Sequence, residues 1–299
     1  MNIRCILRFL FRVLVHYQFV SKCIPDKLFL GTRYWLRTGK KINWNNPQTF
    51  NEKMQWLKVY NRKKEYTQLV DKYKVREFIN DTIGEEYLIP LIGVWDSPDD
   101  ICFNSLPDQF VLKCNHNSGL GMCICRNKKD IQEKQVKKEL KKGLKQDYYI
   151  SGREWPYKDV KRRIVAEEFI QDGVHEDLRD YKVFVFNGKA YYIQVDIDRF
   201  TNHRRNFYTT NWEYVPFTTL YPTDPTIKVE RPKQLNQLIE VSEQLAAAAG
   251  TPPFVRIDMY LLPDKMYFGE ITFFHGGGGE PFYPESYNLQ LGNLIKLPI

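Results

Sequence analysis

The stretch YFGEITFFHGGGGEPF, residues 267–282, raises the question on which the fold and function of this chain depend. Glu270 stands between apolar neighbours in a strand-like run, and four consecutive glycines follow. A buried carboxylate without a cation or a hydrogen-bond donor is costly. A glycine run is favoured where the backbone needs positive φ or must lie close to another group. The segment therefore predicts either a ligand site at a strand end or an exposed acid before a flexible loop.

The residues before this stretch form a hairpin with it, FVRIDMYLLPDKMYFGEITFF (254–274). Arg256 and Asp258 alternate along the first strand and share a face, as Glu270 and Thr272 do on the second. Both acids lie on one face only if the turn has an odd length or a β-bulge corrects the register. We predict one of these two features. The face would then present oxygen ligands that suit Mg²⁺ and phosphate, with an ordinary ion pair between strands as the alternative.

A second hairpin is predicted in DYKVFVFNGKAYYIQVDIDR (180–199). Its Asn187-Gly188 pair is the strongest short-range signal of a two-residue turn. Continuous pairing from that turn would place Lys182 across from Ile193. The resulting face is expected to present Asp180, Lys182 and Arg199 as a clamp for ribose and phosphate.

Strand-like sequence also fills residues 107–170. QFVLKC (109–114), the turn NHNSGLG and MCIC (122–125) predict a hairpin, and RRIVAEEFI (162–170) predicts another strand. Lys113 precedes the glycines of the turn, where a lysine beside backbone N–H groups can bind phosphate. The alternative is a surface lysine before a turn. Glu167 and Glu168, at the end of the other strand, could bind an adenine amino group or be solvated.

Residues 1 to about 100 are predicted to be mainly helical. NPQTFNEKMQWLKVYN (46–61) offers a capping box from Thr49 to Glu52, and LVDKYKVREFINDTIG (69–84) predicts one further helix. QLNQLIEVSEQLAAAAG (234–250) predicts a third. Because helices and strands mix without regular βαβ alternation, the predicted class is α+β. No strand-glycine-helix opening indicates a dinucleotide-binding domain.

The composition describes a globular protein with enough residues for one large domain or two to three lobes: 299 residues, 43% apolar and 27% charged. Its net charge of +8 favours anionic partners such as nucleotides. The lysine-rich run EKQVKKELKKGLK (133–145) is interpreted as a solvated helix face, so we expect no nucleic-acid partner. The six cysteines lack paired C-x-x-C units, which indicates a reducing compartment without structural disulfides.

The N-terminal run MNIRCILRFLFRVLVHYQFV (1–20) is apolar but interrupted by arginines at four-residue spacing. Central arginines disfavour a membrane-spanning helix. On a helix they would line one face, as in helices that lie on an anionic membrane surface. Packing of this helix on its own domain is the alternative. We therefore expect a cytoplasmic protein. If the helix lies on the membrane surface, residues 1–20 would make peripheral contact with the inner face of the membrane.

Taken in order, these motifs resemble the ATP-grasp superfamily. More narrowly, the chain resembles TupA-like ATP-grasp proteins of the teichuronopeptide-biosynthesis type over most of residues 40–299, through NPQTFNEKMQWLK, DKYKVREFI, IGEEYLIPLIGVW, LPDQFVLKCNHNSG and FGEITFF. The resemblance implies two α+β lobes with antiparallel sheets that clasp ATP, preceded by a helical N-terminal region. The implied units are an amphipathic basic segment (1–38), a helical subdomain (39–106), a first lobe (107–170) and a second lobe with the metal site (171–299).

The resemblance also implies roles for individual residues, with ATP and Mg²⁺ as cofactors. The expected nucleotide-binding residues are Lys113, Asn115, His116, Ser118, Gly119, Glu167, Glu168, Phe169, Ile170 and Asp180, with Asp177 as an alternative ribose contact. The expected catalytic residues are Lys182, Arg199 and Arg256, as clamps for phosphate or acyl-phosphate. The expected metal ligands are Asp258, Glu270 and Thr272, the last at a place where the superfamily commonly has asparagine. His116 and His275 could contact phosphate or substrate, with a structural role as the alternative for each.

The function that the resemblance implies is an ADP-forming carboxylate–amine ligase that works through an acyl-phosphate. Its expected substrates are a carboxylate-bearing sugar and an amine, so that an amino acid or another amine is attached to a uronic acid of a bacterial surface polysaccharide. One alternative is an ATP-dependent kinase or sugar-transferring enzyme. A second is a non-catalytic basic protein that binds nucleic acid or membrane.

Overall fold

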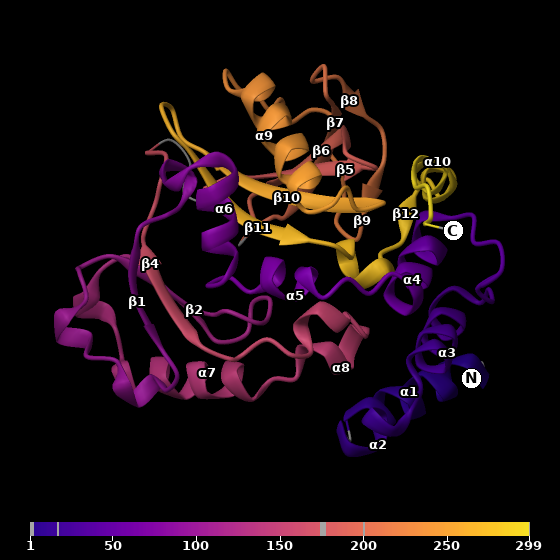
Figure 1. The fold of residues 1–299 in the computed structure, drawn as a ribbon, viewed down its shortest axis with the longest axis horizontal. Coiled ribbons are helices and arrows are strands. Elements are labelled where there is room, and N and C mark those ends of the chain that lie inside the picture. The colour runs from indigo at the N-terminus through magenta and orange to yellow at the C-terminus, as the bar shows by residue number, and fades with distance from the viewer. Residues whose placement is uncertain (1–2, 17, 174–177, 200, 299) are drawn as a thin grey trace.

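The computed structural model describes residues 3–16, 18–173, 178–199 and 201–298, which form two sheet-containing lobes and a helical N-terminal arm (Figure 1). The arm comprises α1 (Ile3–His16), α2 (Gln18–Cys23) and α3 (Asp26–Thr38). Both main sheets are antiparallel and are combined with helices, so the predicted α+β class is confirmed. Within these described ranges, no helix has both the length and the apolar character needed to cross a bilayer.

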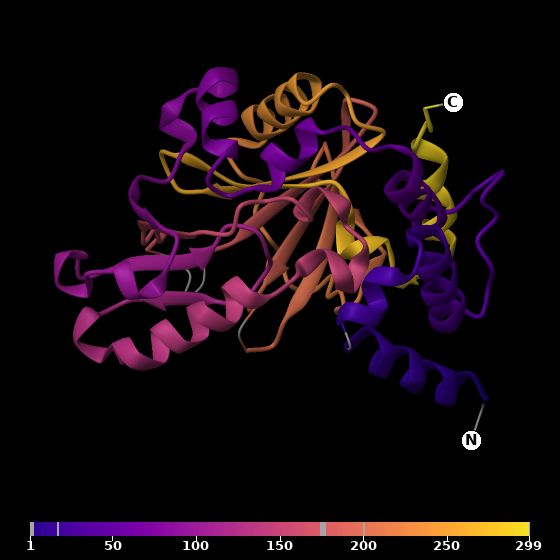
Figure 2. The same cartoon turned by 60° about the horizontal axis from the view of Figure 1, so that its bottom comes forward.

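The smaller lobe is a four-stranded sheet in the order β1-β4-β2-β3. Its strands are β1 (Leu91–Trp95), β2 (Phe110–Cys114), β3 (Met122–Cys125) and β4 (Ile164–Glu168). The helix α7 (Glu133–Lys145) covers one face, where Leu140 joins a buried cluster with Phe110 and Ile164 (Figure 2). The hairpin and the strand predicted in this region are confirmed. β1 was not predicted, because it lies in a segment that the sequence indicates to be mainly helical.

The larger lobe is a six-stranded sheet in the order β11-β10-β5-β6-β7-β8. Its strands are β5 (Asp180–Phe186), β6 (Lys189–Ile197), β7 (Arg204–Thr209), β8 (Tyr214–Val215), β10 (Phe254–Leu261) and β11 (Met266–Thr272). The helix α9 (Leu235–Ala248) packs on this sheet, and β9 (Thr218–Thr219) pairs with β12 (Phe282–Tyr283). The C-terminal helix is α10 (Ser286–Leu294), beside α4 (Phe50–Tyr60) in Figure 1.

An aromatic core joins α4 to the larger sheet. Phe50 is fully buried, and its ring lies 5.0 Å from that of Phe254 and 6.4 Å from that of Phe186. The helix begins with the predicted capping box, in which Thr49 accepts a hydrogen bond from the backbone N–H of Glu52. The capping box fixes where α4 begins, and the aromatic contacts hold the helix against the larger sheet. Asp258 and Glu270 belong to this sheet.

The hairpin of β10 and β11 contains the predicted bulge. A two-residue turn at Pro263-Asp264 connects the strands, and the register shifts by one at Gly269. Asp258 consequently lies directly across from Glu270. A Cβ atom on Gly269 would approach the backbone oxygen of Asp258 to 3.0 Å, so glycine relieves crowding at the bulge. Of the two predicted alternatives, the bulge rather than an odd-length turn corrects the register.

The register predicted for the other hairpin is wrong. Asn187 and Gly188 form the predicted turn, but the pairing shifts by one at Tyr191. Lys182 therefore lies across from Gln194 instead of Ile193. The face that carries Asp180 and Lys182 thus continues into even-numbered residues of β6. The turn sequence determines only the first pairs, and the bulge arises from packing farther along the strands.

The single helix predicted over residues 69–84 is interrupted. It consists of α5 (Glu65–Val70) and α6 (Val75–Ile83). Between them, Asp71 adopts an extended conformation, and its carboxylate accepts hydrogen bonds from the backbone N–H groups of Tyr73 and Lys74. Aspartate side chains favour such local bonds over a helix interior. The break leaves Lys72 outside either helix, in the wall of the pocket described below.

Candidate functional site

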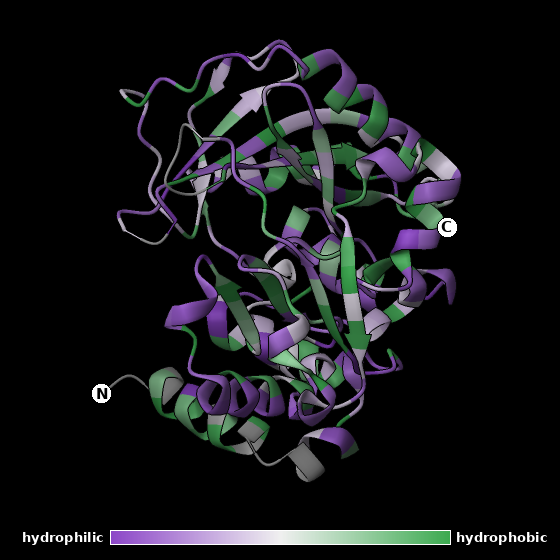
Figure 3. Cartoon of the chain, turned by 90° about the vertical axis from the view of Figure 1, so that its left-hand side faces the viewer, coloured by the Kyte–Doolittle hydropathy of each residue, from purple (hydrophilic) through white to green (hydrophobic). Residues whose placement is uncertain are grey.

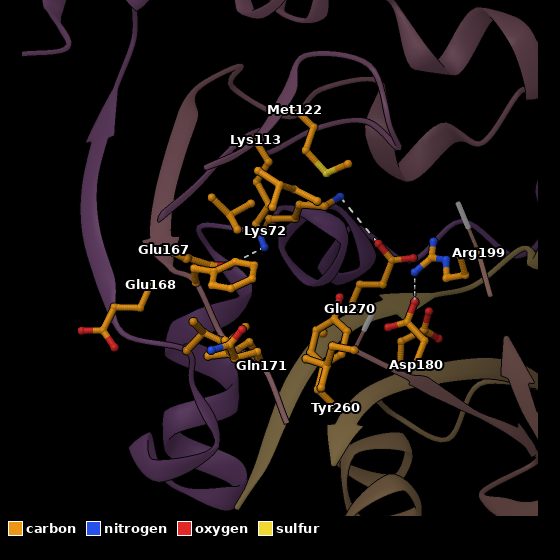
Figure 4. A pocket seen from close by; sticks show the side chains of 18 of the residues that line it. Lys72, Lys113, Met122, Glu167, Glu168, Gln171, Asp180, Arg199, Tyr260 and Glu270 are labelled. Atoms are coloured by element: carbon orange, nitrogen blue, oxygen red, sulfur yellow. Dashed lines mark hydrogen bonds and ion pairs between the residues drawn. The ribbon is translucent and has the colours of Figure 1, made fainter. Parts of the chain in front are cut away.

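A pocket of about 310 Å³ lies between the two sheets. The smaller lobe contributes side chains from β2, β3 and β4, and the larger lobe contributes side chains from β5, β10 and β11. Figure 4 shows Lys113 and Glu167 on one side of this space and Asp180, Tyr260 and Glu270 on the other. Residues far apart in the sequence therefore meet because two antiparallel sheets face each other.

One half of the pocket is apolar. Its lining includes Ile89, Val111, Met122, Ile124, Phe169, Ile170 and Leu178. The segment after β4 borders this half, and its Glu168 and Gln171 place polar groups at the rim (Figure 4). A slot with apolar walls and a polar backbone edge accommodates a flat heteroaromatic ring, such as a purine.

Two lysines from the smaller-lobe side extend into the charged half. Lys113 forms an ion pair with Glu167, 2.5 Å away, and Arg76 lies 3.4 Å from the same carboxylate. Lys72 donates to the backbone oxygen of Asn117 at 2.7 Å, and its ammonium lies 3.6 Å from Glu270. These two ammonium groups supply positive charge where anionic oxygens of a ligand would lie.

Opposite them, the larger sheet presents a cluster of alternating charge. The ammonium of the buried Lys182 lies 2.9 Å from Asp180 and 2.8 Å from Asp258. Arg199 forms a further ion pair with Asp180 (Figure 4). Burial alone would lower the pKa of Lys182, but the two carboxylates reverse that effect and raise it. Lys182 is therefore a cation throughout the physiological pH range.

Arg256 lies behind the pocket lining and organises the two acids. Its guanidinium binds both carboxylate oxygens of Asp258, at 2.6 and 2.7 Å, and donates to Glu270 at 3.1 Å. A further N–H group lies 2.9 Å from Nδ1 of His275. Thr272 donates from its hydroxyl to Glu270 at 3.2 Å. Arg256 and Thr272 thus position the acids from behind and do not line the pocket.

Glu270 is ionised under all ordinary conditions. Burial alone would raise its pKa, but the charges of Lys72, Arg256 and Lys182 outweigh burial and lower the pKa to about 2. Its side chain retains 30% exposure, and that of Asp258 retains 3%. Of the two opposed acids, Glu270 is therefore the more accessible from the pocket, and it carries a permanent negative charge.

The donor set fits Mg²⁺ shared with a phosphate ligand. Mg²⁺ in nucleotide sites is typically held by one or two carboxylates and by the oxygens of the phosphates. Asp258 and Glu270 lie directly opposite each other and both line the pocket. No group of three or more His, Cys, Asp or Glu side chains suited to a metal occurs in the described part of the chain. The carboxylates therefore fit an ion that phosphate oxygens also coordinate.

Most of the residues expected at the site line this pocket. They are Lys113, Ser118, Gly119, Glu167, Glu168, Phe169, Ile170, Asp180, Lys182, Arg199, Asp258 and Glu270. Asp177 lies outside the described residues.

Four expected residues do not line the pocket: Asn115, His116, Arg256 and Thr272. Asn115 is fully buried, and its side chain bonds to Asp71, to the backbone oxygen of Lys161 and to the backbone N–H of Arg163. The imidazole of His116 lies 3.1 Å from the backbone oxygen of Gln146. The polar atoms of Asn115 are thus engaged by neighbouring groups, whereas Nδ1 of His116 is buried without a hydrogen-bond partner. Both side chains lie at the base of the loop, away from the pocket lining.

Sequence reasoning missed three residues of the site. Lys72 fell within the single helix predicted over residues 69–84, and only the helix-breaking tendency of Asp71 could have indicated otherwise. Tyr260 lines the pocket two positions beyond Asp258 on the same strand face, so strand alternation could have identified it. Asp196 lies 4.0 Å from Lys182 and 3.0 Å from Arg205. The unpredicted bulge at Tyr191 concealed it.

The glycine run lies beside this cluster instead of lining the pocket. It forms a tight turn in which Gly276 and Gly277 have φ values of 56° and 61°. A Cβ on Gly278 would lie 2.6 Å from the Cβ of Met54, so the turn packs against α4. Glycine is required there both for the positive φ angles and for the close contact.

Comparison with protein families matches residues 52–296 to the family described as TupA-like ATP-grasp. Among solved structures, similar chains include D-alanine–D-alanine ligase from Helicobacter pylori, with 14% identity, a TM-score of 0.44, and coverage of 82% of this chain and 69% of that chain. The same enzyme from Bacillus anthracis, complexed with ATP, has 16% identity and a TM-score of 0.39, with coverage of 68% of this chain and 53% of that chain. The chain thus spans about half the length of the Bacillus anthracis ligase. Comparison with curated proteins finds no match.

Proposed function

The chain belongs to the TupA-like ATP-grasp family, and from this premise we propose that it is an ATP-dependent ligase that joins a carboxylate to an amine and releases ADP and phosphate. The observation that carries the proposal is the pocket between the sheets. It combines an apolar slot with a charged end in which Asp258 and Glu270 face Lys72 and Lys113. We propose that the two lobes that enclose the nucleotide are residues 107–170, together with β1, and residues 171–299.

In this proposal the ring of the nucleotide occupies the apolar slot, and the backbone from Glu168 to Ile170 binds its polar edge. Lys113 and Lys72 hold the phosphates, and Asp180 binds the ribose. Lys182 and Arg199 stabilise the negative charge of the transferring phosphoryl group. A Mg²⁺ ion bound to Asp258 and Glu270 would neutralise charge on the phosphate oxygens. Arg256 is a positioning residue, because it acts through those two acids.

We propose a uronic acid of a bacterial surface polysaccharide as the carboxylate and an amino acid or a related amine as the second substrate. The resemblance to the teichuronopeptide-biosynthesis type supports this class. We also propose a cytoplasmic location, where ATP is available. Measuring ADP release with uronic acids crossed against amines tests the substrates. A kinase or sugar-transferring enzyme would not require both partners, so product analysis distinguishes the alternatives.

Replacing Lys113 by alanine is expected to weaken binding of Mg²⁺–ATP at least about tenfold, because a charge-assisted bond to phosphate is lost. Titration with a fluorescent ATP analogue measures this change. Lys228→Ala is the matched control, since Lys228 is exposed and lies outside the pocket. Unchanged binding in Lys113→Ala would remove this lysine from the site and favour a non-catalytic protein.

The surface of α1 suggests membrane contact through apolar side chains, whereas the sequence predicted contact through a face of arginines. Arg8 turns inward and donates to the backbone oxygens of Leu36 and Arg37 at the end of α3. The side chains of Arg4 and Arg12 lie outside the described set. The exposed stripe on α1 is apolar and consists of Ile6, Phe9, Leu10 and Val13, at helical spacing. Figure 3 shows this apolar character near the N-terminus. We propose that the stripe inserts into a membrane interface.

Full-length protein is expected to sediment with phosphatidylglycerol-containing vesicles, and the variant Phe9→Ser/Leu10→Ser is expected to remain largely in the supernatant. Phe9 is 66% exposed and Leu10 54%, so the substitutions remove apolar surface without disturbing the core. Leu289→Ser on α10, where Leu289 is 46% exposed, is the matched control. Equal sedimentation of wild type and double variant would contradict the proposal.

A further inference from the structure

Lysines cover the outer face of α7. Their positions follow helical spacing, and they lie on the side away from Val136, Leu140 and Leu144, which pack in the core of the smaller lobe. The helix contains only two acids, Glu133 and Glu139. The lysines of this face, which together with Asp99 line one hollow of the surface, are Lys134, Lys137, Lys138, Lys141, Lys142 and Lys145. All except the half-buried Lys137 are exposed, so the face carries a concentrated positive charge.

Internal partners neutralise little of this charge. Lys141 forms an ion pair with Asp99 at 2.8 Å, and Lys142 forms one with Glu139 at 2.7 Å. Both pairs are exposed to solvent, where an ion pair contributes little free energy. Three lysines of the face form no ion pair within the described residues: Lys134, Lys138 and Lys145. Most of the positive charge therefore remains available to an anionic partner outside the chain.

The lysine face is turned away from the nucleotide pocket. Along β2, the side chains of Val111 and Lys113 line the pocket. Those of Phe110 and Leu112 belong instead to the buried cluster that includes Leu140 of α7. Successive side chains of a strand point to opposite faces of the sheet, so α7 covers the face opposite the pocket. A partner bound to the lysines would leave the pocket uncovered.

The apolar stripe of α1 lies on the same side of the molecule as the lysine face. Arg8 and Phe11 hold α1 against α3, Arg8 through backbone oxygens and Phe11 through its ring, which lies 5.1 Å from that of Phe29. By helical spacing, the apolar stripe is on the opposite side of α1 from these two residues. Figures 1 and 2 show α7 and α1 along the lower side of the molecule, with α3 above α1. The lysines and the stripe therefore point to one common side.

We propose that the lysine face of α7 binds the anionic lipid headgroups of a membrane while the apolar stripe of α1 enters the interface. The inference rests on the proposed insertion of α1, and it assigns a charge to the membrane and an orientation to the protein. An anionic leaflet attracts each lysine that lies near it. Apolar side chains bind at the boundary between headgroups and acyl chains. One flat anionic surface satisfies both features, whereas a nucleic acid would use only the lysines.

The test replaces the three lysines without an internal ion pair, in the variant Lys134→Gln/Lys138→Gln/Lys145→Gln. Its binding to vesicles of equal parts phosphatidylglycerol and phosphatidylcholine is expected to weaken at least about tenfold. Binding to vesicles of phosphatidylcholine alone should stay within about twofold of wild type, because no lipid charge is involved. High salt should remove most of the difference between variant and wild type on the anionic vesicles, since it screens exposed charges.

A matched control removes the same charge from exposed lysines of the larger lobe, in the variant Lys228→Gln/Lys233→Gln/Lys296→Gln. Its binding to the anionic vesicles is expected to stay within about twofold of wild type. Binding of a Mg²⁺–ATP analogue should be unchanged in both triple variants, because none of these lysines lines the pocket. Equal weakening of vesicle binding in the two triple variants, or none in the α7 variant, would overturn the proposal.

Two further measurements distinguish this proposal from its neighbours. Phe9→Ser/Leu10→Ser should weaken binding to both kinds of vesicle, because it removes apolar surface and no charge. Failure of that variant to weaken binding would count against the insertion of α1 and not against the lysine face. Single-stranded DNA serves as a soluble polyanion. If the α7 variant loses binding to DNA but binds anionic vesicles like wild type, the lysine face belongs to a polymer and the proposal is overturned.

Discussion

Replacing Arg256 by methionine is expected to destabilise the folded chain by about 3–5 kcal/mol. The guanidinium is the shared partner of Asp258, Glu270 and Thr272. Methionine fills a similar volume but leaves the two acids dependent on Lys182 and on the more distant Lys72. Burial would lower the pKa of Arg256, but Asp258 and Glu270 raise it, so the charge is bound strongly in the folded state.

Urea unfolding measures this loss as a lower midpoint at an unchanged slope. The matched control is Arg231→Met, since Arg231 is exposed and has one side-chain partner, Asn236, at 3.2 Å. We expect its effect to stay within about 0.5 kcal/mol. Adding Asp258→Asn to Arg256→Met should recover part of the stability, because one uncompensated charge disappears. A midpoint equal to that of wild type would refute the central role of Arg256.

The bulge in the hairpin of β10 and β11 could be predicted from the sequence, because strand alternation and a common site for Asp258 and Glu270 are compatible only with a corrected register. Strand alternation places Asp258 and Glu270 on opposite faces if the turn is the two-residue Pro263-Asp264. A bulge was therefore required for a common site, and Gly269, beside Glu270, provides it. The resemblance to the ATP-grasp superfamily supplied the reason to expect that the two carboxylates lie close together.

The bulge at Tyr191 could not be predicted in the same way. The Asn187-Gly188 turn predicts strand pairing only for the residues next to it. No residue type in β6 indicated that the register would shift and place the other set of side chains on the site-facing side. The shift brings Asp196 to the site and pairs it with Arg205, which in turn binds Glu280, 75 residues later, at 2.9 Å. Such long-range partners depend on how whole strands pack, and a local pattern contains no information about them.

Lys72 escaped prediction for a related reason. It lies in a short connection whose position depends on contacts from distant segments. Lys72 follows Asp71, whose carboxylate also binds Asn115 from the loop after β2. Composition and periodicity identify the strands, but such connections determine which charged groups reach the site.

Replacing Glu270 by glutamine is expected to reduce turnover at least about 100-fold while the fold remains intact. The amide keeps the size of the side chain and can still bond to Arg256 and Thr272. It removes the negative charge that faces the pocket, which a shared Mg²⁺ ion requires. Loss of that charge also leaves Lys72 without its carboxylate partner, 3.6 Å away, so the phosphate end becomes too positive for the metal.

Two measurements separate these effects. Mg²⁺-dependent binding of an ATP analogue should weaken, whereas the metal-independent component should change little or increase, since the site gains positive charge. Thermal unfolding without ligand should stay close to that of wild type, because Glu270 is 30% exposed and Asp258 remains bound to Arg256 and Lys182. Glu230→Gln, which alters an exposed acid outside the pocket, is the matched control. Normal ADP release by Glu270→Gln, together with unchanged Mg²⁺ dependence, would eliminate the Asp258–Glu270 pair as the metal site.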